Sequence, residues 1–384
     1  MFISINLMYC RRWPILPNNR AFKVLVCLLL VGVPALASAT DSTIANAALP
    51  IATQPSVAQP NAAQPNAAQP IVAQPIVAQP NVAQPVEVKE PNIHPDQAFA
   101  SAWQDLQTLS DDAMQGRKTA TAGAELARVY LRQRFAELQL QGQPYDWPFQ
   151  YGVGFSERRG INLVGYRQGC GRPDFYIIVT AHYDHLGGAG RRIMNGADDN
   201  ASGVAGLLYL AALTEQRCPF YSIIFLATDA EEAGLYGAKA FVKTPPVPAS
   251  QWVLNINLDM IGRGERRNKL VVAGTKKLPF LQGITERRRS NVRLVAAHDS
   301  KQLMRGQHTI DWPNASDHAP FRKAGIPYLY FGVDVHPHYH TPDDDWSRIS
   351  PQFYQEALLW IADVFWWVQQ IPAEQWRQGQ ASSR

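Results

Sequence analysis

The sequence predicts an α/β fold, with a mixed, mostly parallel central sheet sandwiched by helices in a single domain. Unbroken apolar runs of strand length alternate with longer segments of helical periodicity. Strands that are apolar without alternation are buried on both faces, as in sheets covered by helices on both sides. Hydrophobic residues make up 46% of the 384 residues and charged residues 18%, so a sizeable core can be buried.

The expected elements follow one another along the globular region. Its first helix covers residues 123–139, where apolar side chains recur at helical spacing, namely Ala127, Leu131, Phe135 and Leu138. Strands are expected at residues 162–166, 175–180, 221–227, 253–258, 292–296 and 328–332. Two further helices are expected at residues 202–216 and 351–369. In such folds, ligands bind at the carboxyl ends of the strands.

Residues 1–39 have the features of a secretory signal peptide. Four basic residues and no acidic residue precede an uncharged apolar stretch at 24–37, which ends in Ala37-Ser38-Ala39. This order is typical of a cleavable signal, and the stretch is short for a membrane-spanning helix, which needs about 20 residues. We expect a secreted or periplasmic protein with no stable membrane span after cleavage. An uncleaved N-terminal anchor is the alternative.

The charge balance gives no reason to expect nucleic acid as a partner. The chain has 36 basic and 32 acidic residues. Subtracting the four basic residues of the signal peptide from the 36 leaves 32 of each sign. A near-neutral mature protein lacks the excess positive charge that phosphate binding favours.

Residues 40–95 are expected to form a disordered spacer. Proline recurs every five residues from Pro50 to Pro85, mostly as Ala-Gln-Pro. Proline at this density removes amide donors and blocks helices and sheet ladders. A recognition role for the repeat is the alternative. The catalytic domain is then expected at residues 96–371, followed by a C-terminal tail at residues 372–384.

Two cysteines remain after removal of the signal peptide. Cys170 and Cys218 each lie just before an expected strand. If the two strands are parallel neighbours, their starts lie close together, and an oxidising compartment then permits one disulfide. Two unpaired thiols are the alternative.

Acidic and histidine side chains gather where the expected strands end or where a helix begins. The clusters are His182 with Asp184, Asp198 with Asp199, Glu231 with Glu232, Asp259 alone, and His340 with Asp344. Because the carboxyl ends of parallel strands share one edge of a sheet, these side chains are expected to converge there.

Convergence of carboxylates favours a metal site. Like charges a few ångströms apart raise each other's pKa unless a cation lies among them, and carboxylate and imidazole ligands suit zinc or a similar ion. Taken singly, each cluster has an ordinary explanation as a helix cap, a surface turn or a solvated acidic face. Their joint placement at strand ends favours function. The His-Glu-x-x-His motif of many single-zinc peptidases does not occur.

The motifs together resemble the M28 family of zinc aminopeptidases. They occur in the family's order over roughly residues 96–369: Ala-His182-Tyr-Asp184, Gly196-Ala-Asp198-Asp199-Asn-Ala-Ser-Gly203, Glu231-Glu232-x-Gly234-Leu-x-Gly237, Asn-Leu-Asp259-Met, Ser316-Asp317-His318-Ala-Pro-Phe321 and His340-Thr-Pro-Asp-Asp344. The resemblance also includes the leader segment 109–117. It implies a zinc-dependent exopeptidase-like fold and two Zn²⁺ ions, with Co²⁺ or Mn²⁺ as other possible native metals.

The resemblance also implies a role for each site residue. His182, Asp198 and Asp259 would hold one metal. Asp198, Glu232 and His340 would hold the other, so that Asp198 bridges the two. Glu231 would be the general base.

The remaining polar residues of the motifs would support this centre. Asp184 would fix the ring of His182, and Asp344 that of His340, because a carboxylate on the far nitrogen of a ligating imidazole sets its tautomer. Asp199 would shape the loop beside the bridging acid.

The expected substrate pocket departs from the family pattern at one place. Some relatives carry a tyrosine shortly before the Ser-Asp-His motif, where this chain has residues 312–315, Trp-Pro-Asn-Ala. Asn314 or His318 is a candidate substitute for that tyrosine, and Tyr339 is a candidate for the pocket wall.

The expected function is that of an exported metallo-aminopeptidase acting on peptides or proteins. A glutaminyl cyclase-like enzyme with a single zinc shares the fold and is one alternative. A non-catalytic binding protein on the same fold is another. The sequence does not specify the preferred N-terminal residue or the oligomeric state.

Overall fold

The computed structural model describes residues 95–376, except 153, 191, 277, 282, 287–290 and 298–309. The chain divides into the units Met1–Ala83 and Gln84–Arg384, and every described residue belongs to the second. The predicted signal peptide, nearly all of the predicted spacer and residues 377–384 lie outside the described residues. The packed region continues beyond residue 371, since Trp376 is fully buried.

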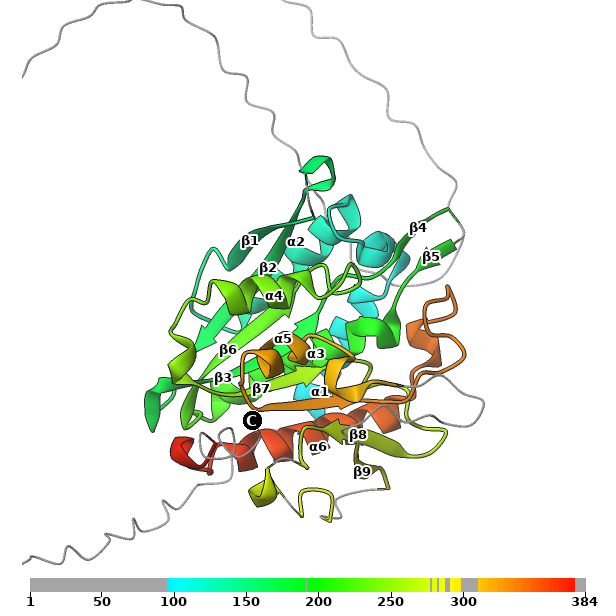
Figure 1. The fold of residues 1–384 in the computed structure, drawn as a ribbon. Coiled ribbons are helices and arrows are strands. Elements are labelled where there is room, and N and C mark those ends of the chain that lie inside the picture. Colours follow the sequence, from blue (N-terminus) through cyan, green and yellow to red (C-terminus); the bar gives the residue numbers. More distant parts are fainter. Residues whose placement is uncertain are drawn as a thin grey trace, which may run out of the picture. The chain divides into compact units, whose positions relative to one another are not determined.

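An eight-stranded mixed sheet forms the centre of the described unit (Figure 1). Its spatial order is β1 (Asp146–Tyr151), β2 (Arg158–Arg167), β6 (Tyr221–Thr228), β3 (Arg172–His182), β7 (Trp252–Leu258), β10 (Tyr328–Gly332), β8 (Lys269–Ala273) and β9 (Arg293–Ala296). The four central strands β6, β3, β7 and β10 are mutually parallel. A separate hairpin joins β4 (Gly187–Ala189) to β5 (Arg192–Met194).

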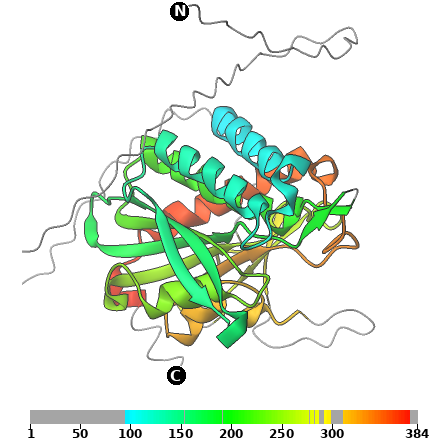
Figure 2. The same cartoon turned by 90° about the horizontal axis from the view of Figure 1, so that it is seen from above.

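Helices cover both faces of this sheet. One face carries α1 (Pro95–Leu109), α2 (Ala122–Glu137), α3 (Gly203–Gln216) and α6 (Pro351–Val368). The opposite face carries the shorter helices α4 (Tyr236–Lys243) and α5 (His318–Lys323). In Figure 2 the cyan helix α1 and the blue-green helix α2 lie on one side of the sheet. The sandwich architecture predicted from sequence is therefore confirmed.

The central strands are buried on both faces, as their continuous apolar sequences predict. Every residue of β6 and β7 is buried. Successive residues of β3 alternate between two cores: Ile177 packs into the larger one under α3 and α6, whereas Ile178 packs into the smaller one with Phe241 and Phe321. Burial on this scale, at about 25 cal/mol per Å² of apolar surface, fixes the strands whose ends carry the polar clusters.

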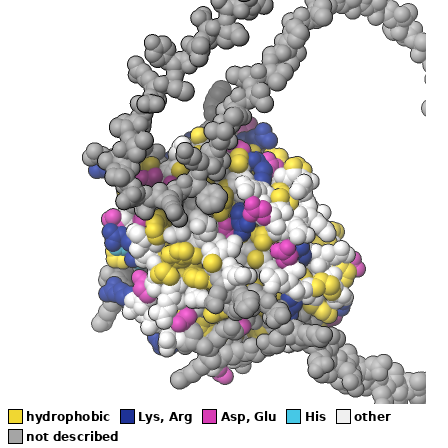
Figure 3. Space-filling view, turned by 180° about the vertical axis from the view of Figure 1, so that it is seen from behind, with side chains coloured by type: hydrophobic (Ala, Val, Ile, Leu, Met, Phe, Trp, Pro, Cys, Tyr) yellow, Lys and Arg dark blue, Asp and Glu magenta, His cyan; other side chains and the backbone are white. Residues whose placement is uncertain are grey.

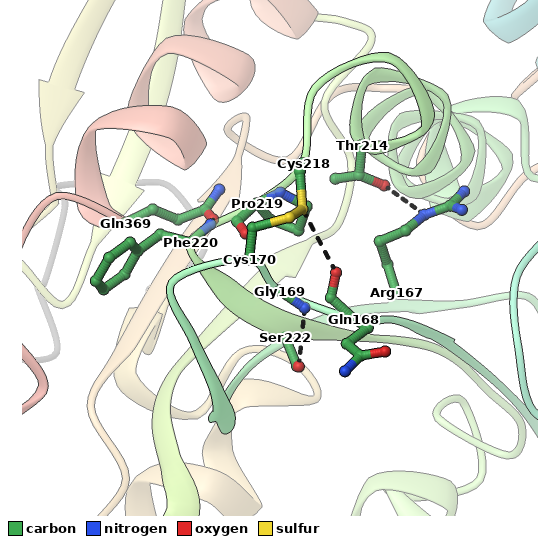
Figure 4. Close-up of a disulfide and its surroundings, with 10 residues drawn as sticks. All are labelled: Arg167, Gln168, Gly169, Cys170, Thr214, Cys218, Pro219, Phe220, Ser222 and Gln369. Atoms are coloured by element: carbon green, nitrogen blue, oxygen red, sulfur yellow. Dashed lines mark hydrogen bonds between the residues drawn. A yellow bond between two sulfur atoms is a disulfide. The ribbon is translucent and has the colours of Figure 1, made fainter. Parts of the chain in front are cut away.

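Cys170 and Cys218 form a disulfide (Figure 4), which decides between the two alternatives left by the sequence. Their Cα atoms are 6.0 Å apart. The bond joins the turn before β3 to the turn before β6, and backbone hydrogen bonds such as Cys170 N–H to the Pro219 carbonyl run beside it. The predicted closeness of the two strand starts is correct, because β3 and β6 are parallel neighbours.

The surface of the described unit carries both signs of charge. On the face drawn in Figure 3, Lys and Arg side chains are interspersed with Asp and Glu. Within the residues that the structure describes, no helix is both long enough and apolar enough to cross a membrane.

Candidate metal centre

Four parallel strands bring the predicted polar clusters to one edge of the sheet. His182 is the last residue of β3, Glu231 and Glu232 lie in the turn after β6, and Asp259 follows β7 directly. His340 lies in the loop after β10. The convergence predicted from the strand ends is therefore present.

Two groups of side chains lie close enough to hold a cation. His182, Glu231 and Asp259 form one group, and His185, Asp199 and Glu232 form the other; in each, the potential ligand atoms lie within 4.8 Å of one another. His340 adjoins the second group.

Asp199 lies between the two groups. Its Oδ1 is 3.4 Å from His182 Nε2, and its Oδ2 is 3.0 Å from His340 Nε2. Beyond these contacts, His182 Nε2 is 3.4 Å from Asp259 Oδ1 and His340 Nε2 is 3.3 Å from Glu232 Oε2. A single carboxylate therefore faces one imidazole of each group.

This geometry reverses the predicted positions of the two adjacent acids, because it is Asp199 and not Asp198 that occupies the central place. The carboxylate of Asp198 is turned into the loop, where its Oδ1 accepts hydrogen bonds from Gly262 N–H at 2.7 Å and from the Ser202 hydroxyl at 3.1 Å. Its Oδ2 is 3.2 Å from His336 Nε2. Successive side chains of this loop point to different sides, and Asp198 supports the loop that presents Asp199.

Asp344 also supports this loop, which corrects its predicted contact with His340. Its carboxylate accepts the backbone N–H groups of Asp198, at 3.1 Å, and Asp199, at 3.0 Å. Among the described residues no hydrogen bond joins Asp344 to His340. Burial and the nearby Asp198 raise the pKa of Asp344 to about 6.

Asp184 lies beside His182, as predicted, but the two residues make a different contact. His182 Nδ1 lies 3.1 Å from the backbone carbonyl oxygen of Asp184, whereas the carboxylate is 3.8 Å away. The carboxylate instead accepts the backbone N–H groups of Glu231, at 3.0 Å, and Glu232, at 3.3 Å. Asp184 thus fixes the turn that carries the two glutamates.

His185 enters the centre although sequence reasoning assigned it no ligand role. Its Nδ1 is 2.7 Å from Glu232 Oε1, and its ring is fully buried. Gly196 makes room for that ring: the φ of Gly196 is 53°, and a Cβ there would overlap the Asp199 carbonyl oxygen and the imidazole of His185. His185 lies only three residues after His182, next to the Ala-His182-Tyr-Asp184 motif. This proximity was the one sequence feature that could have placed it in the centre.

Arg117 connects two loops of the centre through hydrogen bonds to their backbones. Its guanidinium is buried and donates to the backbone carbonyl oxygens of Tyr183, Asn195 and Gly196, at 2.8, 2.6 and 3.0 Å. Burial lowers the pKa of Arg117 to about 10, so it stays charged at neutral pH. The sequence marked this arginine only as the end of the leader segment.

The buried polar atoms of the centre fit a bound cation. Asp199 Oδ2 and His340 Nε2 are 3.0 Å apart, yet each lacks a hydrogen-bond partner in suitable geometry within the described residues. Buried polar atoms left without partners are costly. Because a carboxylate oxygen and an imidazole nitrogen can both direct lone pairs at a metal, their arrangement suits zinc better than it suits a hydrogen bond.

Electrostatics lead to the same conclusion. Burial and the adjacent charge of Glu232 raise the pKa of Asp199, and burial with the charges of Asp317 and Asp259 raises the pKa of Glu231 well above its usual value. Burial alone would lower the pKa of His340, but the adjacent carboxylates of Asp199 and Glu232 outweigh it and raise the pKa to about 10. The carboxylates repel one another, and a divalent cation would relieve that repulsion.

A pocket of roughly 200 Å³ opens over the centre. Tyr339 lines it, as predicted, together with Glu231, Trp312 and Tyr330. Asn314 does not line it and is instead joined to Asp311 and Arg322.

His318 also lies away from the pocket lining, which corrects the second candidate. It is fully buried, stacks on Tyr328 and lies against Tyr330, and its Nε2 is 2.8 Å from the Trp312 carbonyl oxygen. Burial lowers its pKa to about 4. It is a neutral core histidine whose hydrogen bond positions the segment that carries Trp312.

The low pKa of His318 makes folding sensitive to acid. Between pH 6.5 and 4, His318 binds a proton in the unfolded chain but not in the folded chain. The contribution of His318 to the free energy of unfolding is therefore full above pH 6.5 and is lost as the pH falls. We expect the stability of the wild type, relative to His318→Gln, to drop by about 2 kcal/mol between pH 7 and pH 5.

Urea unfolding of both proteins at the two pH values measures this difference, in which the titration of neighbouring Asp317 cancels. A difference that is the same at pH 7 and pH 5 would exclude a neutral, buried His318.

Comparison with known proteins gives matches in sequence and in structure. The family model of peptidase family M28 matches residues 162–365. Aminopeptidase YwaD of Bacillus subtilis (strain 168) is 30% identical over 215 residues, which are 53% of this chain and 43% of that protein. The chain thus spans less than half the length of that curated relative.

Two solved structures illustrate the shared fold. A zinc aminopeptidase from Bacillus subtilis superposes with a TM-score of 0.52 at 17% identity, over 69% of this chain and 94% of its own. A glutaminyl cyclase from Bacteroides thetaiotaomicron superposes with a TM-score of 0.53 at 17% identity, over 70% and 97%. At this level of identity the likeness concerns the fold, which both kinds of protein share.

Proposed function

This chain belongs to peptidase family M28, and we propose that it is an exported aminopeptidase that uses two divalent metal ions, Zn²⁺ in the first instance. The observation that carries the proposal is the position of Asp199, whose two carboxylate oxygens face His182 and His340 on opposite sides. A carboxylate so placed suits a ligand shared between two ions.

The side chains divide into two ligand sets around that carboxylate. We assign His182, Asp199 and Asp259 to one ion, and Asp199, Glu232 and His340 to the other. His185, at 2.7 Å from Glu232 Oε1, would orient that carboxylate. When bound, the ions supply a water of lowered pKa and polarise the substrate carbonyl.

Glu231 is assigned the proton transfers. It lines the pocket over the centre, and its raised pKa suits a group that must both accept and release a proton near neutral pH. Glu231 takes the proton from the water that attacks the carbonyl carbon and delivers it to the leaving amine. The Asp184 carboxylate, by holding the Glu231 N–H at 3.0 Å, keeps this side chain aimed at the pocket.

Tyr339 is assigned to the substrate carbonyl. It lines the same pocket and stacks on His340, with ring centroids 3.7 Å apart. A phenol O–H at this position can donate to the oxygen on which negative charge develops. Tyr339 would thereby take the place of the tyrosine that some relatives carry where this chain has residues 312–315.

Export is supported by two independent features. The order of charge and hydropathy in residues 1–39 is that of a cleavable signal. The Cys170–Cys218 disulfide suits an oxidising compartment such as the periplasm or the extracellular space.

A panel of substrates on the purified mature protein tests the function. We expect hydrolysis of aminoacyl amides and of peptides with a free N-terminus, loss of activity with a chelator, and recovery when Zn²⁺ is returned. N-terminally acetylated peptides serve as the matched control and are expected to resist. Cyclisation of N-terminal Gln with one zinc per chain would instead identify a glutaminyl cyclase, and no turnover of any substrate would indicate a binding protein.

A further inference from the structure

A second, larger pocket of roughly 440 Å³ adjoins the pocket over the metal centre. The two share Ile310, Val335 and Tyr339 in their walls. A substrate held at the metal centre can therefore extend into the second pocket without leaving the protein surface.

This second pocket is strongly basic. Among the described residues that line it, four are cations and one, Asp334, carries a carboxylate; the cations are Arg263, Arg266, Arg267 and Lys269. Asp334 Oδ2 is engaged by Arg267 at 3.1 Å and by Lys269 at 2.8 Å. Arg266 makes no ion pair among the described residues, and Arg263 makes one long ion pair, with Glu265.

Arg263 is the most unusual of these cations. Its side chain is only 12% exposed, and its Nε and Nη1 are buried without a hydrogen-bond partner among the described residues. Its ion-pair partner among the described residues is Glu265, whose Oε1 is 4.0 Å from Nη2. A buried guanidinium with idle donors is costly, because the lost hydration is not replaced.

Arg263 is also rigidly placed relative to the metal centre. It follows Asp259 by four residues, and Gly262 between them donates its N–H to Asp198 Oδ1 at 2.7 Å. The planar fork of an arginine matches a carboxylate with two parallel hydrogen bonds. A carboxylate arriving with the substrate can pair with Nη2 together with either Nε or Nη1, and would then give one of the two unpartnered nitrogens an acceptor.

We propose that this pocket binds a carboxylate of the substrate through Arg263, so that the enzyme prefers peptides that present a carboxylate close to the scissile bond. This inference rests on the proposed peptidase function. The carboxylate has two possible sources: an acidic side chain next to the cleaved bond, or the C-terminal carboxylate of a short peptide. Arg266, which is exposed on the same wall, adds attraction at longer range.

Matched substrate pairs separate these sources. Ala-Ala against Ala-Ala-amide changes only the C-terminal carboxylate. Glu-Ala-amide against Gln-Ala-amide, and Ala-Glu-amide against Ala-Gln-amide, change only one side-chain charge. We expect kcat/KM to be about 10- to 100-fold higher for the charged member of at least one pair, which is the range that a charge-assisted bidentate contact supplies.

Arg263→Gln then tests the residue. The variant is expected to lose that preference while hydrolysing the uncharged members within about threefold of the wild type. Arg172→Gln is the matched control, because Arg172 is exposed, pairs with Glu374 at 3.4 Å and lies outside the pocket wall. Its substrate preference should remain that of the wild type.

The melting temperature distinguishes substrate binding from a structural role, because a variant that loses a structural contact would melt at a lower temperature. Arg263 has no hydrogen bond to lose from Nε or Nη1, so Arg263→Gln is expected to keep or raise the melting temperature. Wild-type enzyme that hydrolyses both members of every pair equally well would overturn the inference and leave the peptidase function intact. Wild-type enzyme that hydrolyses no peptide would overturn both.

Discussion

Glu231→Gln is expected to lower kcat by about 10²- to 10⁴-fold, the range typical for removal of a general base. The amide matches the carboxylate in size and still fills the pocket wall, but it cannot accept the proton of the attacking water. The metal content is expected to stay that of the wild type, since Glu231 is outside both assigned ligand sets. Steady-state kinetics with elemental analysis of the same sample measures both quantities.

Glu232→Gln is the matched control for this substitution. Glu232 is the adjacent residue, but its Oε1 and Oε2 lie 2.7 Å from His185 Nδ1 and 3.3 Å from His340 Nε2. Its neutralisation is expected to lower metal occupancy as well as turnover. Glu231→Gln that keeps more than a tenth of the wild-type kcat would remove Glu231 from the proton transfers.

Asp199→Asn is expected to reduce the metal content from two ions per chain to one or fewer, with activity falling below that of any other single substitution of a ligand. Asp199 is the only carboxylate of the described centre that faces both His182 and His340. Asparagine offers one neutral oxygen in place of two charged ones, so it cannot serve two cations. Elemental analysis after dialysis against metal-free buffer gives the count.

Asp198→Asn is the control that separates the two neighbouring acids. Its carboxylate supports the loop through Gly262 and Ser202, so we expect metal affinity to weaken by about 10- to 100-fold, as for partners that orient a ligand. Both sites should still fill when metal is in excess. Loss of both ions from Asp198→Asn, with both retained by Asp199→Asn, would restore the assignment first drawn from the sequence.

The sequence predicted the buried part of the fold well, because burial leaves a clear pattern. The central strands β3, β6, β7 and β10, which are buried over most or all of their length, appear as largely apolar runs, and all four lie where they were expected. Edge strands leave a weaker signal. In β1, Pro148 and exposed polar residues interrupt the run, and this strand was not predicted.

The sequence located the site but not the direction of each side chain within it. Asp198 and Asp199 are adjacent and chemically alike, and only the hydrogen bonds from Gly262 and Ser202 show which carboxylate is turned into the loop. Asp344 was assigned to His340 because the two share a motif, whereas its partners Asp198 and Asp199 lie 146 and 145 residues away in the chain.

Arg263 illustrates a further limit of the sequence. Its proposed role rests on the unpartnered state of Nε and Nη1 among the described residues. A sequence motif does not show which donors lack a hydrogen bond in the folded chain. His318 shows the converse, since a histidine within a family motif proved to be a neutral core residue stacked on Tyr328.

The position of the bound metal is the most direct test of a two-ion centre built on Asp199. Anomalous diffraction at the zinc edge, from crystals of the zinc-loaded mature protein, locates each ion independently of activity. We expect two peaks on opposite sides of the Asp199 carboxylate, one beside His182 and Asp259 and the other beside Glu232 and His340. A single peak, or peaks that flank Asp198, would contradict the proposed centre.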